Sequence, residues 1–192
     1  YKSTDAGATW RSIGLEATRH IQTILIDPRS PDVVLVGALG DHINANSARG
    51  VYRSTDGGRT WAKTLHIDDS TGIAKLARAF DVPDVIFATS VRHWTPPGYD
   101  IGKYRSWQFG TAVRPQPDTG RTGTAIYKSL DGGVTWKELQ SSGLPRLLGR
   151  MTIGVAMGTN AQRVYLITDG GLYRSDDGGG TWRRMAADDP RI

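Results

Sequence analysis

The sequence contains no cysteine among its 192 residues. This absence excludes disulfide bonds, structural thiolate zinc sites and a cysteine nucleophile. The sequence also lacks any run of about 18 consecutive apolar residues, so no segment is predicted to span a membrane. We therefore expect neither thiol chemistry nor a membrane span in this chain.

Residues that favour turns are abundant, since 24 glycines and 9 prolines stand beside short runs of Val, Ile and Leu. This composition is typical of an all-β chain with many turns. The 24 Lys and Arg exceed the 19 Asp and Glu and give a net charge of +5, but they are spread along the sequence. A nucleic-acid-binding protein would gather its basic residues in one stripe or on one helix, so we expect no nucleic-acid partner.

A ten-residue segment recurs as YKSTDAGATW at 1–10, YRSTDGGRTW at 52–61, YKSLDGGVTW at 127–136 and YRSDDGGGTW at 173–182. The intervals between successive aspartates of the four copies are 51, 75 and 46 residues. These intervals indicate a unit of roughly 40 to 50 residues, the length of a propeller blade, with an insertion in one unit.

Between the copies, pairs of short apolar runs are separated by turn-forming residues. The pairs are HIQTILI and VVLVGAL, IAKLARAF and VIFATSV, and MTIGVAM and VYLIT. Each pair predicts a hairpin, and the recurring segment predicts a second hairpin, with GVYRS entering, TDGGR turning and TWAKTL leaving. Each unit is therefore expected to form four antiparallel strands, named A to D in chain order.

Within the recurring segment, each residue type suits a tight turn. The Asp side chain accepts backbone N–H bonds, glycine takes a positive φ, and the Trp packs its apolar face on the turn. The second glycine is present in every copy whereas the first is Ala6 in the opening one, so we expect the geometry to require the second. The residues given this structural role are Asp5, Gly7, Trp10, Asp56, Gly58, Trp61, Asp131, Gly133, Trp136, Asp177, Gly179 and Trp182.

Two chemical interpretations of the segment fail on spacing. A phosphate-binding loop needs a Lys after its last glycine, and an EF-hand loop needs alternating acidic ligands and a Glu at position twelve. No copy has either arrangement. Fourfold recurrence also disfavours catalysis, because an active site is usually single. We expect no metal site and no cofactor.

The pattern S-x-D-x-G-x-T-W resembles the Asp-box, or bacterial neuraminidase repeat (BNR). This repeat occurs in sialidases, sortilin-type receptors, two-propeller xyloglucan hydrolases and many secreted bacterial proteins, and the segment order here looks most like bacterial propellers labelled sortilin-like or glycosidase-like. The resemblance implies an all-β fold, a β-propeller segment of about three and a half four-stranded antiparallel blades in an incomplete ring. It also implies an extracellular or periplasmic protein. The expected divisions are 1–19 (the second half of a blade), 20–68 (a blade), 69–143 (a blade with the insert 92–123) and 144–192 (a blade).

An incomplete ring leaves the face of a blade in water. An exposed apolar patch of about 300 to 600 Å² forgoes roughly 8 to 15 kcal/mol of burial, which is comparable to the stability of a whole domain. We therefore expect the remaining blades of the same propeller, or another copy of the chain, to close the ring.

Antiparallel strands alternate in direction, so the A–B and C–D turns lie on one face of the ring and the B–C and D–A loops on the other. The recurring segments are C–D turns, which directs the search for a ligand site to the opposite, loop face. The loops expected there include GDHINANSAR, HIDDSTG with Asp68 and Asp69, SSGLPRLLGR, and the insert.

The insert holds both tryptophans that lie outside the recurring segments. Its aromatic residues and arginines suit stacking on sugars or gripping an extended peptide. Alternatively, the insert packs its aromatic residues over its own blade or a neighbouring domain. The candidate ligand-binding residues on this face are His42, Trp94, Tyr99, Tyr104, Arg105 and Trp107.

Asp169, in YLITDGGLYRS, is the candidate catalytic residue. Its surroundings resemble the T-D-x-G-G-x-Y-R segment that carries a catalytic carboxylate in xyloglucan-hydrolysing propellers, but with one residue fewer between the Asp and the glycine pair. DGG is also an ordinary turn, and glycoside hydrolysis needs a second carboxylate that the sequence does not assign.

Two functions remain open at this point. The first is a non-catalytic propeller segment of a larger secreted or envelope protein, which recognises protein or glycan ligands through its loop face. The alternative is part of a glycoside hydrolase, xyloglucanase-like or sialidase-like, that contributes one wall of the cleft.

Overall fold

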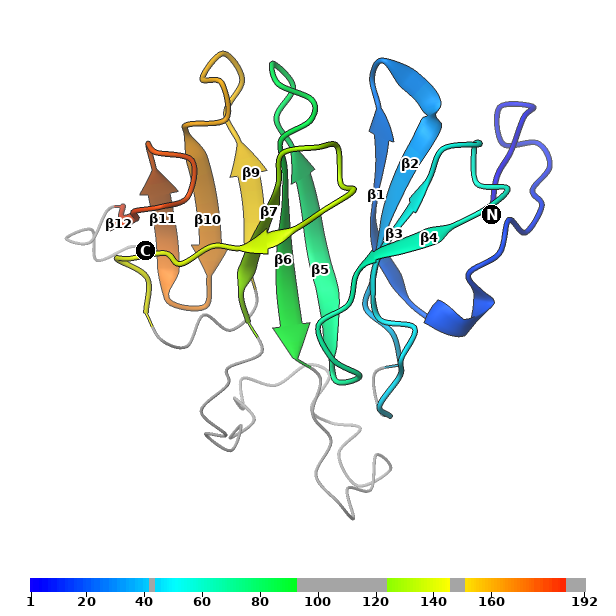
Figure 1. Cartoon of the computed structure of the whole chain (residues 1–192), viewed down its shortest axis with the longest axis horizontal. Coiled ribbons are helices and arrows are strands. Elements are labelled where there is room, and N and C mark those ends of the chain that lie inside the picture. Colours follow the sequence, from blue (N-terminus) through cyan, green and yellow to red (C-terminus); the bar gives the residue numbers. More distant parts are fainter. Residues whose placement is uncertain (42–43, 93–123, 146–150, 186–192) are drawn as a thin grey trace.

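The computed structural model describes residues 1–41, 44–92, 124–145 and 151–185. They form three four-stranded antiparallel sheets that stand in a row, with the amino-terminal end of the chain at one end of the row and the carboxyl-terminal end at the other (Figure 1). The row does not close on itself. The expected all-β fold, an incomplete propeller of four-stranded antiparallel blades, is confirmed.

Strands follow one another in chain order within each sheet. The first sheet contains β1 (Ile21–Asp27), β2 (Ser30–Ala38), β3 (Gly50–Ser54) and β4 (Ala62–Leu65). The second contains β5 (Thr71–Arg78), β6 (Ile86–Arg92), β7 (Ile126–Ser129) and β8 (Lys137–Glu138). The third contains β9 (Thr152–Val155), β10 (Val164–Thr168), β11 (Gly171–Ser175) and β12 (Arg183–Arg184). Ahead of them, residues 1–19 carry an antiparallel bridge between Lys2 and Arg11 and a 3-10 helix η1 (Glu16–Thr18).

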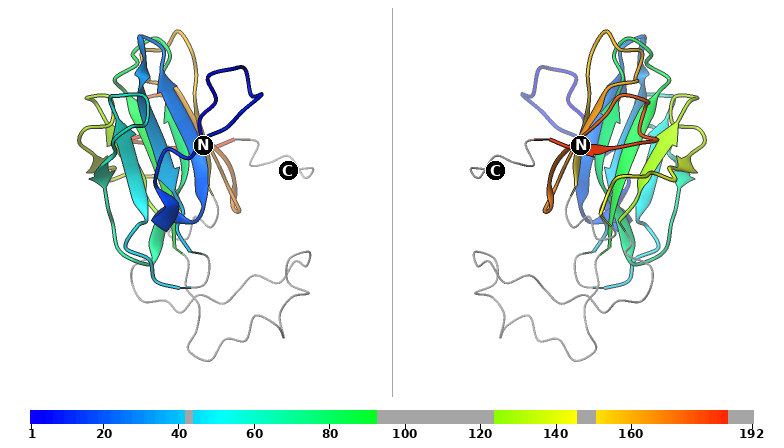
Figure 2. Two further views of the ribbon diagram at one scale, coloured as in Figure 1. Left: turned by 90° about the vertical axis from the view of Figure 1, so that its right-hand side faces the viewer. Right: turned by 90° about the vertical axis from the view of Figure 1, so that its left-hand side faces the viewer.

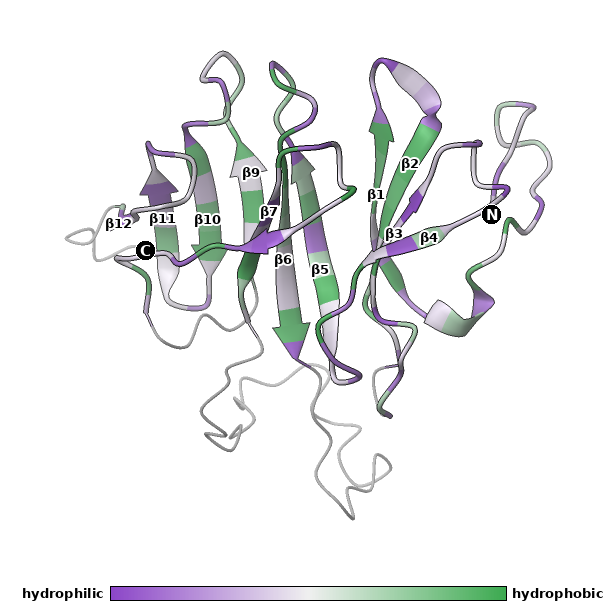
Figure 3. Cartoon of the chain, viewed as in Figure 1, coloured by the Kyte–Doolittle hydropathy of each residue, from purple (hydrophilic) through white to green (hydrophobic). Residues whose placement is uncertain are grey.

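Apolar side chains on the strands are buried between neighbouring sheets. Figure 3, in which the ribbon is coloured by hydropathy, shows hydrophobic residues along the first two strands of each sheet. The core between the first two sheets includes Leu35 and Val51 on one side and Ile73 on the other. The core between the second and third sheets includes Phe87 and Leu166. Viewed from either end of the row, the sheets overlap (Figure 2), and β1 contacts β5 as β5 contacts β9.

The two ends of the row expose apolar side chains. The equivalent positions of the repeat are buried where two sheets pack together. At the first end, Ile24 and Ile26 of β1 are exposed, as is Trp10 in the segment before it. At the other end, Ile167 of β10 is exposed. Each end therefore offers a sheet face suited to packing against a further blade.

The predicted strand 73–80 differs in detail from β5, which ends at Arg78. Ala79 pairs with Val85 across the A–B turn, and Phe80 lies exposed in that turn. The apolar run therefore extends past the strand because a turn residue can be apolar without being buried.

As strand alternation predicts, the A–B and C–D turns lie together at one edge of the row, and the described parts of the B–C and D–A connections lie at the other (Figure 1). We call these edges the Asp-box face and the loop face. Among the described residues, no helix is long and apolar enough to cross a membrane.

Candidate functional site

Each recurring segment closes its turn with the same set of hydrogen bonds. In the second copy, Asp56 accepts bonds from the Thr60 amide (2.9 Å) and the Thr60 hydroxyl (2.6 Å), and from the Ser54 hydroxyl (2.8 Å). The Ser54 oxygen in turn accepts the Gly58 amide at 2.8 Å. Bonds to Thr60, and then to Ser54, hold the pKa of the Asp56 carboxyl well below its usual range. The carboxylate of the Asp-box aspartate thus accepts its hydrogen bonds from residues of its own turn.

Both glycine positions of the segment have a left-handed backbone. At the first position φ is 55° in Ala6 and 69° in Gly57, which an L residue can adopt at some cost. At the second position φ is 92° in Gly7 and 89° in Gly58. A Cβ on Gly58 would lie 2.6 Å from Cδ1 of Ile13 in the preceding repeat, so a side chain there would have to displace Ile13 and would also strain the left-handed backbone.

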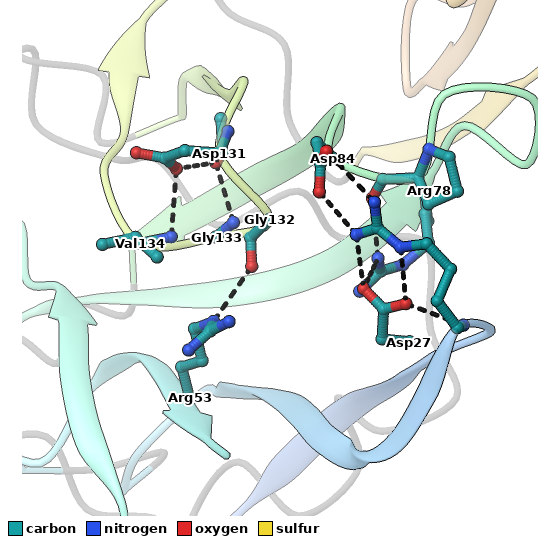
Figure 4. Close-up of polar contacts among 11 residues, drawn as sticks. Asp27, Arg53, Arg78, Asp84, Asp131, Gly132, Gly133 and Val134 are labelled. Atoms are coloured by element: carbon teal, nitrogen blue, oxygen red, sulfur yellow. Dashed lines mark hydrogen bonds and ion pairs between the residues drawn. The ribbon is translucent and has the colours of Figure 1, made fainter.

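Successive Asp-boxes are joined by hydrogen bonds that we call inter-blade clamps. The basic residue after the Tyr of one copy donates to the carbonyl of the first glycine in the next. The three clamps are Lys2 Nζ to Gly57 O (2.9 Å), Arg53 Nε to Gly132 O (3.1 Å, Figure 4) and Lys128 Nζ to Gly178 O (3.1 Å). The amides of Gly132 and Gly178 each donate to a carbonyl in the A–B turn of their own sheet, and the Gly57 amide donates to the Asp32 carbonyl near the start of β2. The Asp-box therefore links its own blade to the preceding one.

A buried ion pair ties the A–B turn of the first sheet to the second sheet on the same face (Figure 4). Asp27 accepts from Nη1 of Arg78 at 2.8 Å, and both side chains are buried. Arg29 donates both to Asp27 and across the gap to Asp84. Bonds from Arg29, opposed by burial, keep the pKa of Asp27 far below its usual range. These contacts hold the first and second sheets together on the Asp-box face.

One cavity of about 280 Å³ lies on this face, between the C–D turns of the first and second sheets. No carboxylate or imidazole is among its lining residues, so it offers no general acid or base. The lining residues are Arg53, Thr55, Thr60, Ala62, Thr64 and Val134.

On the loop face, Arg49 organises the connection between β2 and β3. Its side chain is 1% exposed and donates to backbone carbonyls on two loops. Burial lowers the pKa of Arg49, which nearby carboxylates oppose. The acceptors are the carbonyl oxygens of Leu39, Asp41, Asn44 and Asp69. Because four carbonyls converge on one buried cation, the described part of the B–C loop of the first sheet and the D–A loop after it form one hydrogen-bonded unit.

The rim of this unit carries polar groups that reach solvent. Nε2 of His66 lies 3.4 Å from Oδ1 of Asp69, and both side chains are more than a third exposed. Asp68 is more buried; burial would raise its pKa, but bonds from Ser70 and Thr71 and the charge of Arg92 lower it. We call Asp41, His66, Asp68 and Asp69 the loop-face wall. It presents three carboxylates and an imidazole on loops that Arg49 joins by hydrogen bonds.

Asp169 lies on the loop face, in the two-residue turn between β10 and β11. The amide of Gly170 donates to the Thr168 hydroxyl at 2.9 Å, which fixes this turn. A Cβ on Gly170 would lie near Tyr173 and Pro145. The turn is thus on the face where a ligand is expected, and the Thr168 hydroxyl, the Tyr173 phenol and the Pro145 ring lie beside Gly170.

The remaining candidate residues, His42, Trp94, Tyr99, Tyr104, Arg105 and Trp107, lie outside the described residues. Within the described ranges, no group of three or more His, Asp or Glu side chains is placed to hold a metal ion. Sequence reasoning overlooked Arg49, because an Arg in a polar loop gives no signal of burial. The repeated Lys or Arg after the box Tyr was a visible signal for the clamps.

Sequence comparison identifies the repeats. Residues 52–63 and 173–184 match the model of the BNR/Asp-box repeat. No curated protein matches the sequence. The chain therefore contains BNR/Asp-box repeats, as the resemblance of its recurring segments indicated.

Several solved structures share the fold. An ancestral GH74 enzyme aligns with a TM-score of 0.64 and 23% identity, over 100% of this chain and 22% of that chain. The GH74 xyloglucanase from Xanthomonas campestris aligns with a TM-score of 0.55 and 20% identity, over 88% of this chain and 22% of that chain. YCF48 bound to a D1 peptide aligns with a TM-score of 0.51 and 16% identity, over 85% and 38%. This chain spans 22% to 38% of the length of these proteins, and the likeness is one of fold.

Proposed function

We propose that this segment of an Asp-box propeller recognises protein or glycan ligands through its loop face, without catalysis. The observation that supports this proposal is a difference between the polar groups of the two faces. Clamps and ion pairs occupy the polar groups of the Asp-box face, whereas the loop-face wall presents the exposed side chains of His66 and Asp69, beside the half-buried Asp41 and Asp68, on loops joined by Arg49. A preorganised wall loses little entropy when a ligand binds.

The chemistry of the wall suits neutral or basic ligands. Exposed carboxylates and an imidazole accept and donate hydrogen bonds to sugar hydroxyls, and the carboxylates attract the Lys or Arg side chains of a peptide. A propeller of the same fold, YCF48, has been solved with a D1 peptide bound. We further propose an extracellular or periplasmic location, on the resemblance to secreted Asp-box proteins.

A glycan array and a peptide array, probed with the intact protein, test this proposal. The variant Asp69→Asn removes the charge of one of the three wall carboxylates and keeps the shape of the side chain and the backbone carbonyl, so we expect binding to weaken about tenfold. Arg59→Gln, an exposed change on the Asp-box face, is the matched control and should leave binding intact. Equal loss in both variants would contradict a loop-face site.

The alternative is part of a glycoside hydrolase, and it is favoured by the position of Asp169 on the loop face together with the fold shared with GH74 enzymes. Release of reducing sugar from xyloglucan by the intact protein tests it. If turnover occurs and Asp169→Asn abolishes it, this segment contributes an acid to the cleft. Full activity in Asp169→Asn would remove Asp169 from the reaction, and binding without turnover would support recognition alone.

A further inference from the structure

The cavity of about 280 Å³ on the Asp-box face lies where one position of the repeat is polar. Three residues after the box Trp, the first and third copies have Ile13 and Leu139, and each lies next to the second glycine of the following box. The second copy has Thr64 at this position, and its oxygen accepts the indole Nε1–H of Trp136 at 3.2 Å. Thr64 is smaller than either apolar residue, and the space it leaves belongs to the cavity between the first and second sheets.

A second lining position also departs from the repeat. Ala62 directly follows the box Trp, where the other three copies have the long basic side chains of Arg11, Lys137 and Arg183. Its methyl group shares the cavity with Val134 of the next box, which is 49% exposed. Three copies accommodate a long side chain at this position, so the turn itself does not require a small one. The small lining of the cavity is therefore specific to this blade interface.

Arg53 is the one charged residue among those that line the cavity. Its clamp uses Nε, which donates to the Gly132 carbonyl at 3.1 Å (Figure 4), and this bond fixes the guanidinium at the cavity wall. Among the described residues, neither Nη group of Arg53 has a hydrogen bond or an ion pair. Both groups are therefore available to an anion, and a guanidinium can donate two parallel N–H bonds to one carboxylate.

Hydroxyl groups supply the rest of the polar lining. Since the Thr64 oxygen accepts a bond from Trp136, its hydroxyl proton remains available to donate. The Thr55 hydroxyl has no hydrogen-bond partner in the described part of the chain. Thr60 donates its proton to Asp56 at 2.6 Å and so offers lone pairs to the cavity. The lining thus combines a cation, hydroxyl donors and acceptors and two small apolar groups, and it contains no carboxylate that would repel an anion.

We propose that this cavity binds the terminal hexuronate unit, a six-carbon sugar acid, of an acidic glycan. The carboxylate accepts from both Nη groups of Arg53, and the ring hydroxyls bond to the three threonine hydroxyls. The C–H face of the ring packs on Ala62 and Val134. A volume of about 280 Å³ is just below the range of about 300 to 1,000 Å³ that small-molecule pockets span, which suits a single ring. This site lies on the Asp-box face and does not depend on the loop-face wall.

Isothermal titration calorimetry of the intact protein with the methyl glycoside of glucuronate tests the proposal. We expect saturable binding. Methyl glucoside has the same ring without the carboxylate and should bind about tenfold more weakly, since it loses the charge-assisted bonds. Sodium sulfate supplies an anion without a ring and should also bind more weakly. No saturable binding of the glucuronide, or equally tight binding of either control, would overturn a sugar-acid site.

Two variants test whether the ligand lies in the cavity. Arg53→Lys keeps the charge and the clamp, which Lys2 and Lys128 also make, but it removes the paired Nη donors. We expect the affinity for the glucuronide to fall about tenfold. Thr64→Leu introduces into the cavity the side chain that Leu139 has at the same repeat position, and it should abolish binding. Circular dichroism of each variant establishes that it is folded.

Two control variants separate this site from other surfaces. Arg59→Lys makes the same change at an exposed arginine of the same box, and Asp69→Asn changes the loop-face wall. Both should bind the glucuronide like the unmodified protein. An affinity that ignores Arg53→Lys and Thr64→Leu, or one that falls equally in Arg59→Lys, would overturn the proposal. A loss confined to Asp69→Asn would place the sugar acid on the loop face and would also overturn it.

Discussion

The Nε atom of Arg53 lies 3.1 Å from the carbonyl oxygen of Gly132, 79 residues away in the next blade. This clamp joins two parts of the chain that no local rule brings together. The same bond recurs from Lys2 and Lys128, so it belongs to the repeat. The Asp-box has two roles. It closes its own turn, and its glycine carbonyl accepts a hydrogen bond from the preceding blade.

Replacing Arg53 by Met removes the clamp and keeps most of the aliphatic volume. The Gly132 carbonyl then loses its partner at a half-buried interface, and we expect the free energy of unfolding to fall by about 1 kcal/mol. Urea denaturation of the chain followed by tryptophan fluorescence measures this change. Arg59→Met, an exposed arginine in the same box, is the control. Equal effects of the two variants would mean that the clamp contributes nothing beyond surface charge.

The serine of the box is a second test, because its environment differs between copies. Ser129 is buried, and its oxygen accepts the Gly133 amide at 2.8 Å and the Asp131 amide at 3.3 Å. Ser129→Ala leaves a buried amide without a partner, so we expect a loss of about 1 to 3 kcal/mol in urea denaturation. Ser3→Ala removes the same bonds in the exposed first box, where water can replace them. A loss as large in Ser3→Ala would contradict the role of burial.

The fold and the turn of each repeat could be predicted from the sequence because they depend on local chemistry. Asp56 and Gly58 lie within a few residues of their hydrogen-bond partners, and the spacing of such residues repeats along the chain. The burial of Arg49 could not be predicted, because its four carbonyl acceptors lie on loops whose path depends on the assembled sheets. The pairing of Asp27 with Arg78 is likewise set by how two sheets face each other.

The candidate ligand residues illustrate the same limit. Strand alternation predicts which face a loop occupies, and the turn between β10 and β11, which contains Asp169, lies on the loop face. Which side chains of different loops approach one another is decided by tertiary packing. The closeness of His66 and Asp69 to the loop organised by Arg49 therefore became visible only in the structure.

Acid should destabilise the chain through its box aspartates. The pKa of Asp131 is lowered from 3.8 to about 2, because bonds from Thr135 and Ser129 outweigh the opposing effect of burial. A group whose pKa is lower in the folded state than in the unfolded state stabilises the folded state at pH values above its unfolded-state pKa. This contribution disappears as the pH falls towards the folded-state pKa. We expect the midpoint of urea denaturation to decrease between about pH 4 and pH 2. Asp131→Asn should show a smaller decrease over the same interval, although it is less stable at pH 7; an unchanged pH dependence would rule out the Asp131 contribution.

The buried pair of Asp27 and Arg78 should be the most sensitive polar contact of the Asp-box face. Nη1 of Arg78 has two acceptors, Asp27 and the Pro83 carbonyl, whereas Nε and Nη2 are buried with no hydrogen-bond partner among the described residues. Asp27→Asn removes the charge that compensates this buried cation, so we expect the free energy of unfolding to fall by about 3 to 5 kcal/mol. Asp84→Asn, which changes the exposed partner of Arg29, should have little effect, because water screens an exposed pair. Urea denaturation at pH 7 compares the two variants. If Asp27→Asn were as mild as Asp84→Asn, the pair would have to be hydrated, and the first two sheets would be held together by their apolar core and the Arg53 clamp.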